Sequence, residues 1–191
     1  ITTIIRLLLG YPAAYIMAMA DFKTPQVMAM LFILPMWINF LLRTIATVEL
    51  FRMFGLPLGE GALLFGMVYD FLPFMIYPIY NTLQKMDTSL IEAAHDLGAK
   101  RHQVFMKVTL PLSAPGIYSG IVMVFMPTVS TFAIAELLTH NKITLFGSLI
   151  QRSFGEGGIA MWNYGAALSL IMLVIIGLTS FFGGDNEDIN R

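Results

Sequence analysis

Two carboxylates lie in or directly after apolar stretches of the sequence. Asp70 lies near the middle of the apolar run 61–83, beside Tyr69, and Glu136 follows the apolar run 110–135. An ionisable side chain at membrane depth is costly, so it is a functional hypothesis by default. A carboxylate beside aromatic rings suits a polyammonium ligand, because ion pairing adds to a cation–π attraction of about 0.5–2 kcal/mol. The alternatives are a protonated or helix-paired Asp70 with a structural role, and an exposed Glu136 at a helix end.

Other polar and aromatic residues are candidates to line the same cavity. Trp37, Asn39 and Tyr69 have suitable side chains, with plain packing or an interfacial position as the alternative for each. Arg6 lies inside the first apolar run, where a long cationic side chain either snorkels toward the outer surface or pairs with Asp70. The residues predicted for a substrate pathway are Glu136, Asp70, Trp37 and Tyr69.

No residue pattern indicates an enzyme or a metal site. The chain has no cysteine, and its three histidines do not have metal-ligand spacing. The glycine-rich stretch 155–158 is not a dinucleotide fingerprint, and no G-x-x-x-x-G-K-[ST] loop is present to cradle ATP phosphates. We therefore expect no cofactor on this chain, and any chemistry of ATP and magnesium must belong to a separate ATPase.

The polar segment 84–111 reads as a short helix outside the bilayer. Ser89 and Glu92 have capping-box spacing, which predicts a helix start near Ser89. Gly98 can adopt a positive φ and end that helix, and a second basic helical stretch, 100–108, then leads to Pro111 at the start of a membrane helix. The helix predicted between Ser89 and Gly98 has one apolar side and is too short and too polar to span a membrane. That side must be buried against its own bundle, the lipid headgroups or another protein.

The composition indicates an all-α membrane protein. Hydrophobic residues make up 57% of the chain, and charged residues 12% against about 25% in soluble domains. The net charge of −1 indicates no polyanionic partner such as nucleic acid. We predict a single transmembrane domain, 1–182, and a polar tail, 183–191. The predicted spans are 1–20, 26–42, 61–83, 110–135 and 164–182, and we interpret 43–60 and 136–163 as outer loops.

Basic residues predict the orientation of these spans. The segment 84–109 holds the densest cluster of basic side chains, namely Lys85, Lys100, Arg101 and Lys107. Because short cytoplasmic loops are enriched in Lys and Arg, this segment is predicted to lie in the cytoplasm. Alternation then places the C-terminal tail inside and the segments 43–60 and 136–163 outside.

The polar segment also resembles a known signature. Glu92-Ala93-Ala94, then Gly98, then Val108-x-Leu110-Pro111 is similar to the EAA motif of ABC importer permeases, with Val108 where the motif has Ile. The resemblance implies a helix bundle of the type I importer kind. It also implies that this loop is a coupling helix docking in a cleft of the separate ATPase. In that family Glu92 and Gly98 matter most for docking.

Further stretches resemble the permeases of polyamine (spermidine/putrescine) importers. They are 10–15, 34–37, 42–44, 66–69, 72–75 and 90–120. The resemblance implies a multi-pass protein of the bacterial cell membrane, a polyamine substrate, a second permease, an extracytoplasmic binding protein, and an acid at the place of Glu136. It also implies a sixth helix before Ile1 and a shortened outer segment after Arg43. The alternatives are a permease for another small solute, and a fragment that acts only in assembly.

Overall fold

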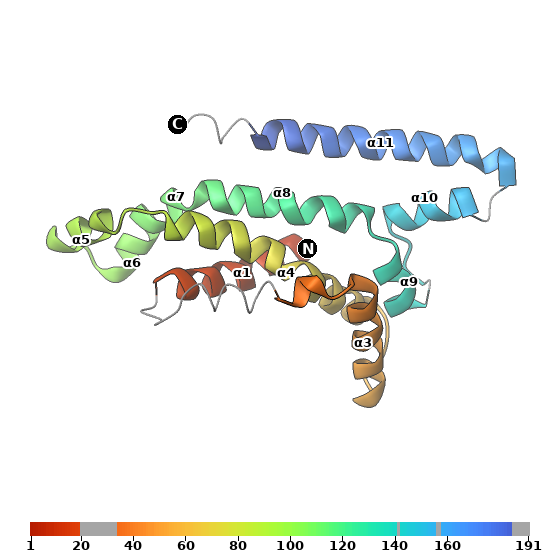
Figure 1. The fold of residues 1–191 in the computed structure, drawn as a ribbon, viewed down its shortest axis with the longest axis horizontal. Coiled ribbons are helices and arrows are strands. Elements are labelled where there is room, and N and C mark those ends of the chain that lie inside the picture. Colours follow the sequence, from red (N-terminus) through yellow and green to blue (C-terminus); the bar gives the residue numbers. More distant parts are fainter. Residues whose placement is uncertain (20–33, 141, 156–157, 185–191) are drawn as a thin grey trace.

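The computed structural model describes residues 1–19, 34–140, 142–155 and 158–184, and this part of the chain is helical without strands. Figure 1 shows long helices running side by side, with shorter helices at both ends of the bundle. The elements are α1 (Thr2–Met19), the 3₁₀ turn η1 (Leu34–Trp37), α3 (Phe40–Met53), α4 (Glu60–Gln84), α5 (Thr88–Asp96), α6 (Arg101–Val104), the π-helical turn η2 (Phe105–Thr109), α7 (Leu110–Leu112), α8 (Ala114–Ser130), α9 (Ala133–Thr139), α10 (Phe146–Gly155) and α11 (Gly158–Gly184).

Three helices of the described residues are long and apolar enough to cross a membrane. They are α1, α4 and the part of α11 from Met161 to Thr179. The segments 101–112 and 114–130 make a fourth span if their 59° bend is taken as a break within one crossing. These helices confirm the spans predicted at 1–20, 61–83 and 164–182. Of the span predicted at 26–42, residues 26–33 lie outside the described residues, and the rest forms η1 and the start of α3 rather than one continuous helix.

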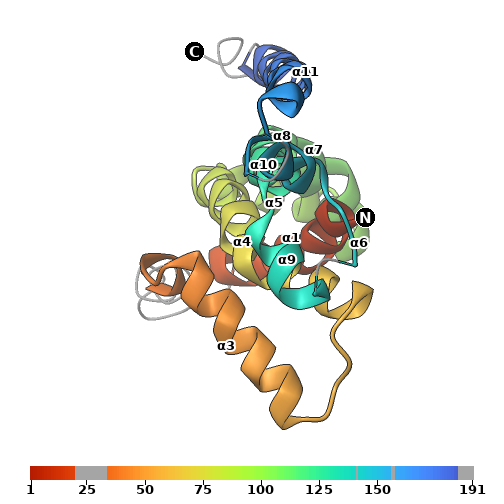
Figure 2. The same cartoon turned by 90° about the vertical axis from the view of Figure 1, so that its right-hand side faces the viewer.

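Helix α4 is the centre of the bundle, with α1 and α8 packed along it (Figures 1 and 2). Its buried side chains include Met75, Ile76 and Ile79, each at most 2% exposed. Small residues permit the close approach of α8 to α4. A Cβ on Gly116 would lie 2.5 Å from Thr82 Oγ1 and 2.9 Å from the carbonyl oxygen of Pro78. The packing of α8 therefore depends on a glycine at this position.

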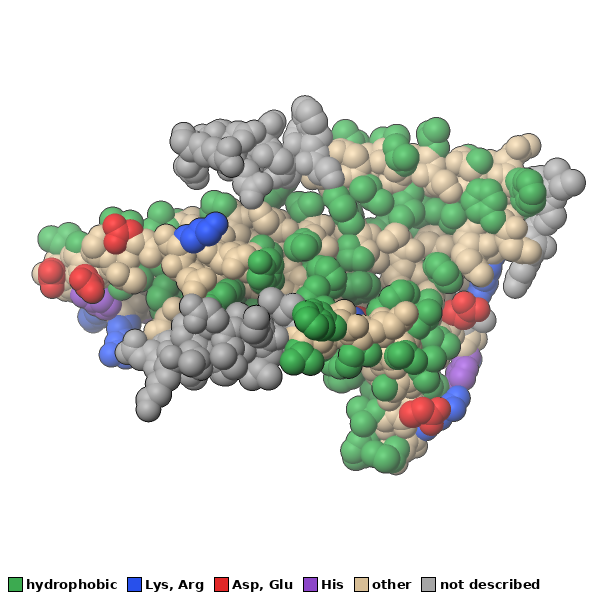
Figure 3. All heavy atoms as spheres, in the orientation of Figure 1, with side chains coloured by type: hydrophobic (Ala, Val, Ile, Leu, Met, Phe, Trp, Pro, Cys, Tyr) green, Lys and Arg blue, Asp and Glu red, His purple; other side chains and the backbone are tan. Residues whose placement is uncertain are grey.

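Charged side chains gather at the two ends of the long axis, and hydrophobic side chains cover much of the surface between them (Figure 3). One end carries α5 and α6, and the other carries α9 and the end of α3 (Figure 1). The predicted inner segment 84–109 and the predicted outer segments therefore lie at opposite ends of the bundle, which is the distribution that a membrane slab requires.

The prediction of a loop over 43–60 was wrong for residues 43–53, which belong to α3, and is confirmed only over residues 54–59. The side chain of Asn39 caps this helix by accepting from Leu41 N at 2.9 Å. Glu49 and Arg52, taken as signs of a loop, form an exposed i,i+3 pair at 2.9 Å on the helix surface. Gly55, at φ +64°, follows the helix and allows the chain to turn.

The single span predicted over 110–135 was also wrong at both ends. The chain bends between α7 and α8 at Ser113, where Pro111 and Pro115 lack the N–H groups of a regular helix. It breaks again at Thr131, which is extended, before α9 begins. The stretch 136–163, predicted as a loop, contains the rest of α9, α10 and the start of α11.

Candidate functional site

The structure has two regions with functional chemistry. The first is the polar hairpin, defined here as α5 to α7 (Thr88–Leu112). Its first helix begins at Thr88, close to the predicted start, but the predicted capping role of Ser89 was wrong. Asp87 is the cap, and its Oδ1 accepts from Ser89 N at 2.9 Å. The hydrogen bonds from the backbone and side chain of Ser89 lower the pKa of Asp87 below its usual value.

Helix α5 ends as the sequence predicts, at Gly98. This residue has φ +81°, and its N–H donates to the carbonyl of His95 at 2.8 Å. Ala99 N donates to the carbonyl of Ala94 at 3.1 Å. The two bonds form a Schellman motif, which favours glycine because its left-handed position strains any residue with a Cβ.

No residue of α5 is buried by the rest of the described chain. Glu92 and Ala93 are exposed, Ala94 is partly covered, and Leu90 and Leu97 are 48% and 89% exposed. The described part of the bundle therefore does not bury the apolar side of α5. Further along the polar hairpin, Leu110 is partly buried and Pro111 is exposed.

Aromatic contacts join the polar hairpin to α1. The ring of Phe105, in η2, meets the rings of Tyr11 and Tyr15 edge-on, with centroids 5.8 and 5.5 Å apart. The hydroxyl of Tyr11 hydrogen-bonds Ser113 Oγ at 2.9 Å, and Ser113, at the 59° bend, is fully buried. The hairpin is therefore in direct contact with α1, so a movement of the hairpin would act on that helix.

The second region is the charged cluster, defined here as Arg6, Arg43, Thr44 and Asp70. Asp70 is fully buried in α4, and its Oδ1 lies 3.4 Å from Arg43 Nε without a hydrogen bond. Its Oδ2 lies 3.0 Å from the hydroxyl of Thr44, which also lies 2.9 Å from the carbonyl of Phe40. Arg43 Nη2 donates to the backbone carbonyl of Asp70 at 3.2 Å. Among the described residues, the charged partner of the Asp70 carboxylate is thus Arg43, which was predicted to lie in an outer loop.

Arg6 is fully buried and does not snorkel to a surface. Its Nη1 donates to Thr128 Oγ1 at 2.6 Å and its Nη2 to the carbonyl of Met67 at 2.7 Å. The guanidinium carbon lies 5.1 Å from the centroid of the Phe71 ring. Arg6 therefore connects α1 to α4 and α8. The sequence also offered an ion pair between Arg6 and Asp70. In the structure, the described ion pair of Asp70 is with Arg43 instead.

A cavity of about 700 Å³, here called the aromatic cavity, opens beside the charged cluster. Arg43 and Asn39 supply polar groups to its wall, and no described carboxylate lines it. Its aromatic lining consists of Trp37, Phe40, Phe71, Phe74 and Phe132.

The four residues predicted for a substrate pathway do not converge on one point. Trp37 lines the aromatic cavity and is 86% exposed, whereas Asp70 is buried behind Arg43. Tyr69 lines a separate space beside α3, and Glu136 is exposed on α9 and lines none of the described cavities. Sequence reasoning missed Arg43, although Arg43, Thr44 and Thr47 at helical spacing could have indicated a polar face on α3.

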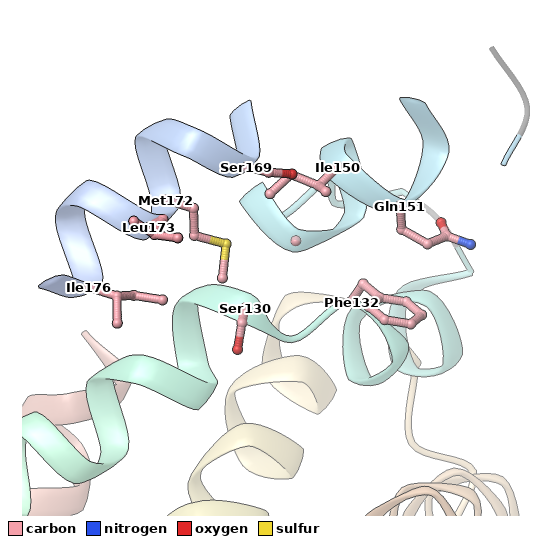
Figure 4. A pocket seen from close by; sticks show the side chains of 9 residues that line it. Ser130, Phe132, Ile150, Gln151, Ser169, Met172, Leu173 and Ile176 are labelled. Carbon is pink, nitrogen blue, oxygen red and sulfur yellow. The ribbon is translucent and has the colours of Figure 1, made fainter. Parts of the chain in front are cut away.

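A further cavity of about 550 Å³ lies between α8, α10 and α11 (Figure 4). It is lined mainly by apolar side chains, including Met172, Leu173 and Ile176. Ser130 and Ser169 also reach it, but their hydroxyls donate to carbonyls of their own helices at 3.0 and 2.9 Å. None of the described residues that line this cavity carries a charge.

Comparison with known proteins decides the family. The family described as binding-protein-dependent transport system inner membrane component matches residues 10–184. The chain belongs to this family. It is a permease subunit of an ABC importer, a multi-pass protein of the bacterial inner membrane and not an enzyme. Membership implies partners of three general kinds: an ATPase on a separate polypeptide, a second permease and a solute-binding protein.

Relatives of the permease include transport proteins from several bacteria. It is 34% identical to the spermidine/putrescine transport system permease protein PotB of Escherichia coli K12, over 93% of this chain and 70% of that protein. It is 36% identical to the protein of the same name in Haemophilus influenzae, over 100% and 72%. Identity to the PotB homolog of Mycoplasma genitalium is 28%, over 95% and 69%.

A solved structure confirms the predicted fold class. The permease superposes on a chain of the MetNI methionine ABC transporter, in an inward-facing conformation, with a TM-score of 0.72. The match covers 100% of this chain and 92% of that chain, at 20% sequence identity. At this identity the likeness describes the fold alone.

Proposed function

We propose that this permease imports a polyamine such as spermidine or putrescine, and that a separate ATPase docks on the polar hairpin. The observation that carries the coupling proposal is that no residue of α5 is buried by the described chain, with Glu92 and Gly98 in an EAA motif. An apolar helix side that its own chain leaves uncovered requires a partner. The names of the relatives support the substrate, and a second permease and an extracytoplasmic binding protein complete the proposed importer.

The aromatic contacts of the hairpin provide a route for force. When the ATPase moves α5, the adjoining η2 turn would carry Phe105 against Tyr11 and Tyr15 of α1. Helix α1 also holds Arg6, whose guanidinium lies over Phe71 in the wall of the aromatic cavity. One helix, α1, thus contacts both the hairpin and the cavity wall, and this continuous contact supports an alternating-access cycle.

The aromatic cavity suits the organic part and the charge of a polyamine. Its rings can pack against methylene groups and attract ammonium groups, each well-placed cation–π contact being worth about 0.5–2 kcal/mol. Glu136, one turn beyond Ala133 of the cavity wall, is the exposed acid we assign to the entry of the cation.

A second candidate substrate is a solute with a carboxylate or another anionic group. One observation favours it: Arg43 reaches the aromatic cavity, and its Nη1 has no hydrogen-bond partner among the described residues. A guanidinium in such a place binds carboxylates well. The uptake experiment therefore includes both kinds of solute.

The test is uptake into proteoliposomes that contain the complete importer, with the binding protein and ATP supplied. We expect ATP-dependent accumulation of radiolabelled spermidine, with unlabelled putrescine competing and glutamate not competing. Uptake of a carboxylate in place of spermidine would overturn the polyamine assignment and leave the permease assignment standing.

Two variants separate the roles of the acids in the same assay. We expect Glu92→Ala to uncouple ATP hydrolysis from uptake, because it alters the exposed docking face without touching the core. Glu136→Gln should weaken uptake while leaving assembly unchanged. Normal uptake by Glu92→Ala would remove the coupling role from that residue, and normal uptake by Glu136→Gln would remove that acid from the pathway.

A further inference from the structure

The carboxylate of Asp70 is held loosely for a buried charge. Its Oδ1 has no hydrogen bond, and Arg43 Nε lies 3.4 Å away without hydrogen-bond geometry. Its Oδ2 competes with the carbonyl of Phe40 for the single proton of the Thr44 hydroxyl. A buried carboxylate normally has its lone pairs filled, often by a bidentate arginine. Asp70 therefore has capacity for a stronger cationic donor.

Arg43 separates the aromatic cavity from a second space. That space, here called the side cavity, has a volume of about 270 Å³ and is lined by Arg43, Ala46, Thr47, Leu50, Phe65 and Tyr69. The guanidinium carbon of Arg43 already lies 5.8 Å from the centroid of the Tyr69 ring, which stacks on Phe65. The guanidinium thus has an aromatic surface and free volume available on the side away from the aromatic cavity.

We propose that Arg43 is an exchangeable counter-ion of Asp70, which the ammonium group of the transported polyamine replaces during passage through the aromatic cavity. The guanidinium, which already lies over Tyr69, then moves away from Asp70 into the side cavity, and an ammonium N–H donates to Asp70 Oδ1. This inference rests on the proposed polyamine substrate, since a solute without a cationic group has no means to replace Arg43.

Exchange of one cation for another avoids the largest electrostatic cost at this site. Removing Arg43 alone would leave a buried carboxylate unpaired, which is strongly unfavourable, whereas a simultaneous exchange keeps the carboxylate paired throughout. Arg6 remains in place, because Thr128 and the carbonyl of Met67 hold it. Its positive charge opposes tight retention of the substrate, and a transport site must release what it binds.

The test compares a structural ion pair with an exchangeable one. The double variant Arg43→Gln/Asp70→Asn removes both charges and retains side chains of similar size. If the pair only supports the fold, the double variant should assemble and take up spermidine as the wild-type importer does. We expect instead that it assembles and hydrolyses ATP, but that its KM for spermidine rises about tenfold or more, because a hydrogen bond to a charged group is lost. A wild-type KM in the double variant would overturn the proposal.

A second pair of variants tests the other position of the guanidinium. Tyr69 and Tyr77 both lie on α4 and are 43% and 45% exposed, so Tyr69→Leu and Tyr77→Leu remove a similar buried area, and uptake is compared at equal amounts of assembled importer. We expect Tyr69→Leu to slow maximal uptake and Tyr77→Leu to leave it unchanged. Equal uptake by the two variants would contradict the proposal even if the double variant failed to assemble. A wild-type importer that moves no polyamine would overturn the proposed function itself, which is a separate outcome.

Discussion

The polar hairpin and the charged cluster differ in the sequence separation of the residues that their hydrogen bonds join. In the hairpin, the defining hydrogen bonds join Asp87 to Ser89, Gly98 to His95 and Ala99 to Ala94, all within five positions. In the charged cluster, the bonds of Arg43 and Thr44 to Asp70 span 27 and 26 positions, and those of Arg6 span 61 and 122.

This difference has a physical consequence for each region. Each cap of the hairpin depends on a few neighbouring residues and stays in contact with water, so its loss is local. The charges of the cluster are buried where no water replaces a lost partner, so removal of one group leaves another uncompensated. Substitutions should therefore lower global stability in the cluster, and should lower docking rather than stability in the hairpin.

The largest effect is expected from Arg43→Gln alone. It leaves the carboxylate of Asp70 buried beside a neutral amide, and breaking a buried pair in this way costs about 3–5 kcal/mol. We expect a clear fall in the thermal unfolding midpoint of the detergent-solubilised permease. The Arg43→Gln/Asp70→Asn variant should recover most of the loss, and Glu92→Ala, in the hairpin, should leave the midpoint unchanged. A midpoint for Arg43→Gln equal to the wild-type value would remove the contrast between the two regions.

A smaller loss is expected where α8 packs against α4. The added methyl group of Gly116→Ala would meet Thr82 Oγ1 at 2.5 Å and the Pro78 carbonyl at 2.9 Å, and overpacking of this kind costs about 1–3 kcal/mol. Gly177→Ala in α11 is the control, because nothing lies within 4 Å of the position of its Cβ. Thermal unfolding should separate the two variants, and equal midpoints would show that the helices adjust at no cost.

The sequence best predicted the features that depend on hydrogen bonds between neighbouring residues. It located α5, its end at Gly98 and the basic stretch that follows, because caps and turn residues are visible in a short window. The same signals were present around α3, where Asn39 precedes the helix and Gly55 follows it. The error there came from treating Glu49 and Arg52 as loop residues, when paired charges are equally compatible with an exposed helix surface.

The charged cluster could be predicted only in part. The position of Asp70 in an apolar run identified it as unusual, but its partner depends on how α3 crosses α4. That crossing is set by tertiary packing, and no local signal states that Arg43 rather than Arg6 reaches the carboxylate. The breaks at Ser113 and Thr131 were missed for a related reason, since hydropathy does not distinguish one long helix from two bent segments of equal polarity.

Gly98→Ala tests whether a local change at the end of α5 weakens docking of the ATPase. Its left-handed conformation costs a residue with a Cβ about 1–2 kcal/mol, although the methyl group itself would meet no neighbour within 4 Å. Gly55 provides a matched control, because it ends α3 at φ +64° with the same pair of bonds, Leu56 N to Phe51 O and Gly55 N to Arg52 O. We expect similar strain in both variants, but weaker capture of the ATPase only in Gly98→Ala. Equal capture would show that the shape of the α5 end does not matter for docking.

The smallest effect is expected from the titration of Asp87, because this cap is exposed. Since folding lowers the pKa of Asp87, its contribution is complete above the ordinary carboxyl value of 3.8 and is lost as the pH falls through the lower, folded value. Amide hydrogen exchange at Ser89 should therefore accelerate in acid relative to Asp87→Asn, whose neutral side chain accepts the same hydrogen bond at every pH. The comparison at each pH cancels the intrinsic pH dependence of exchange. Parallel profiles for the two proteins would mean that the charge of Asp87 adds nothing to the cap, and that the start of α5 depends on the geometry of the hydrogen bond alone.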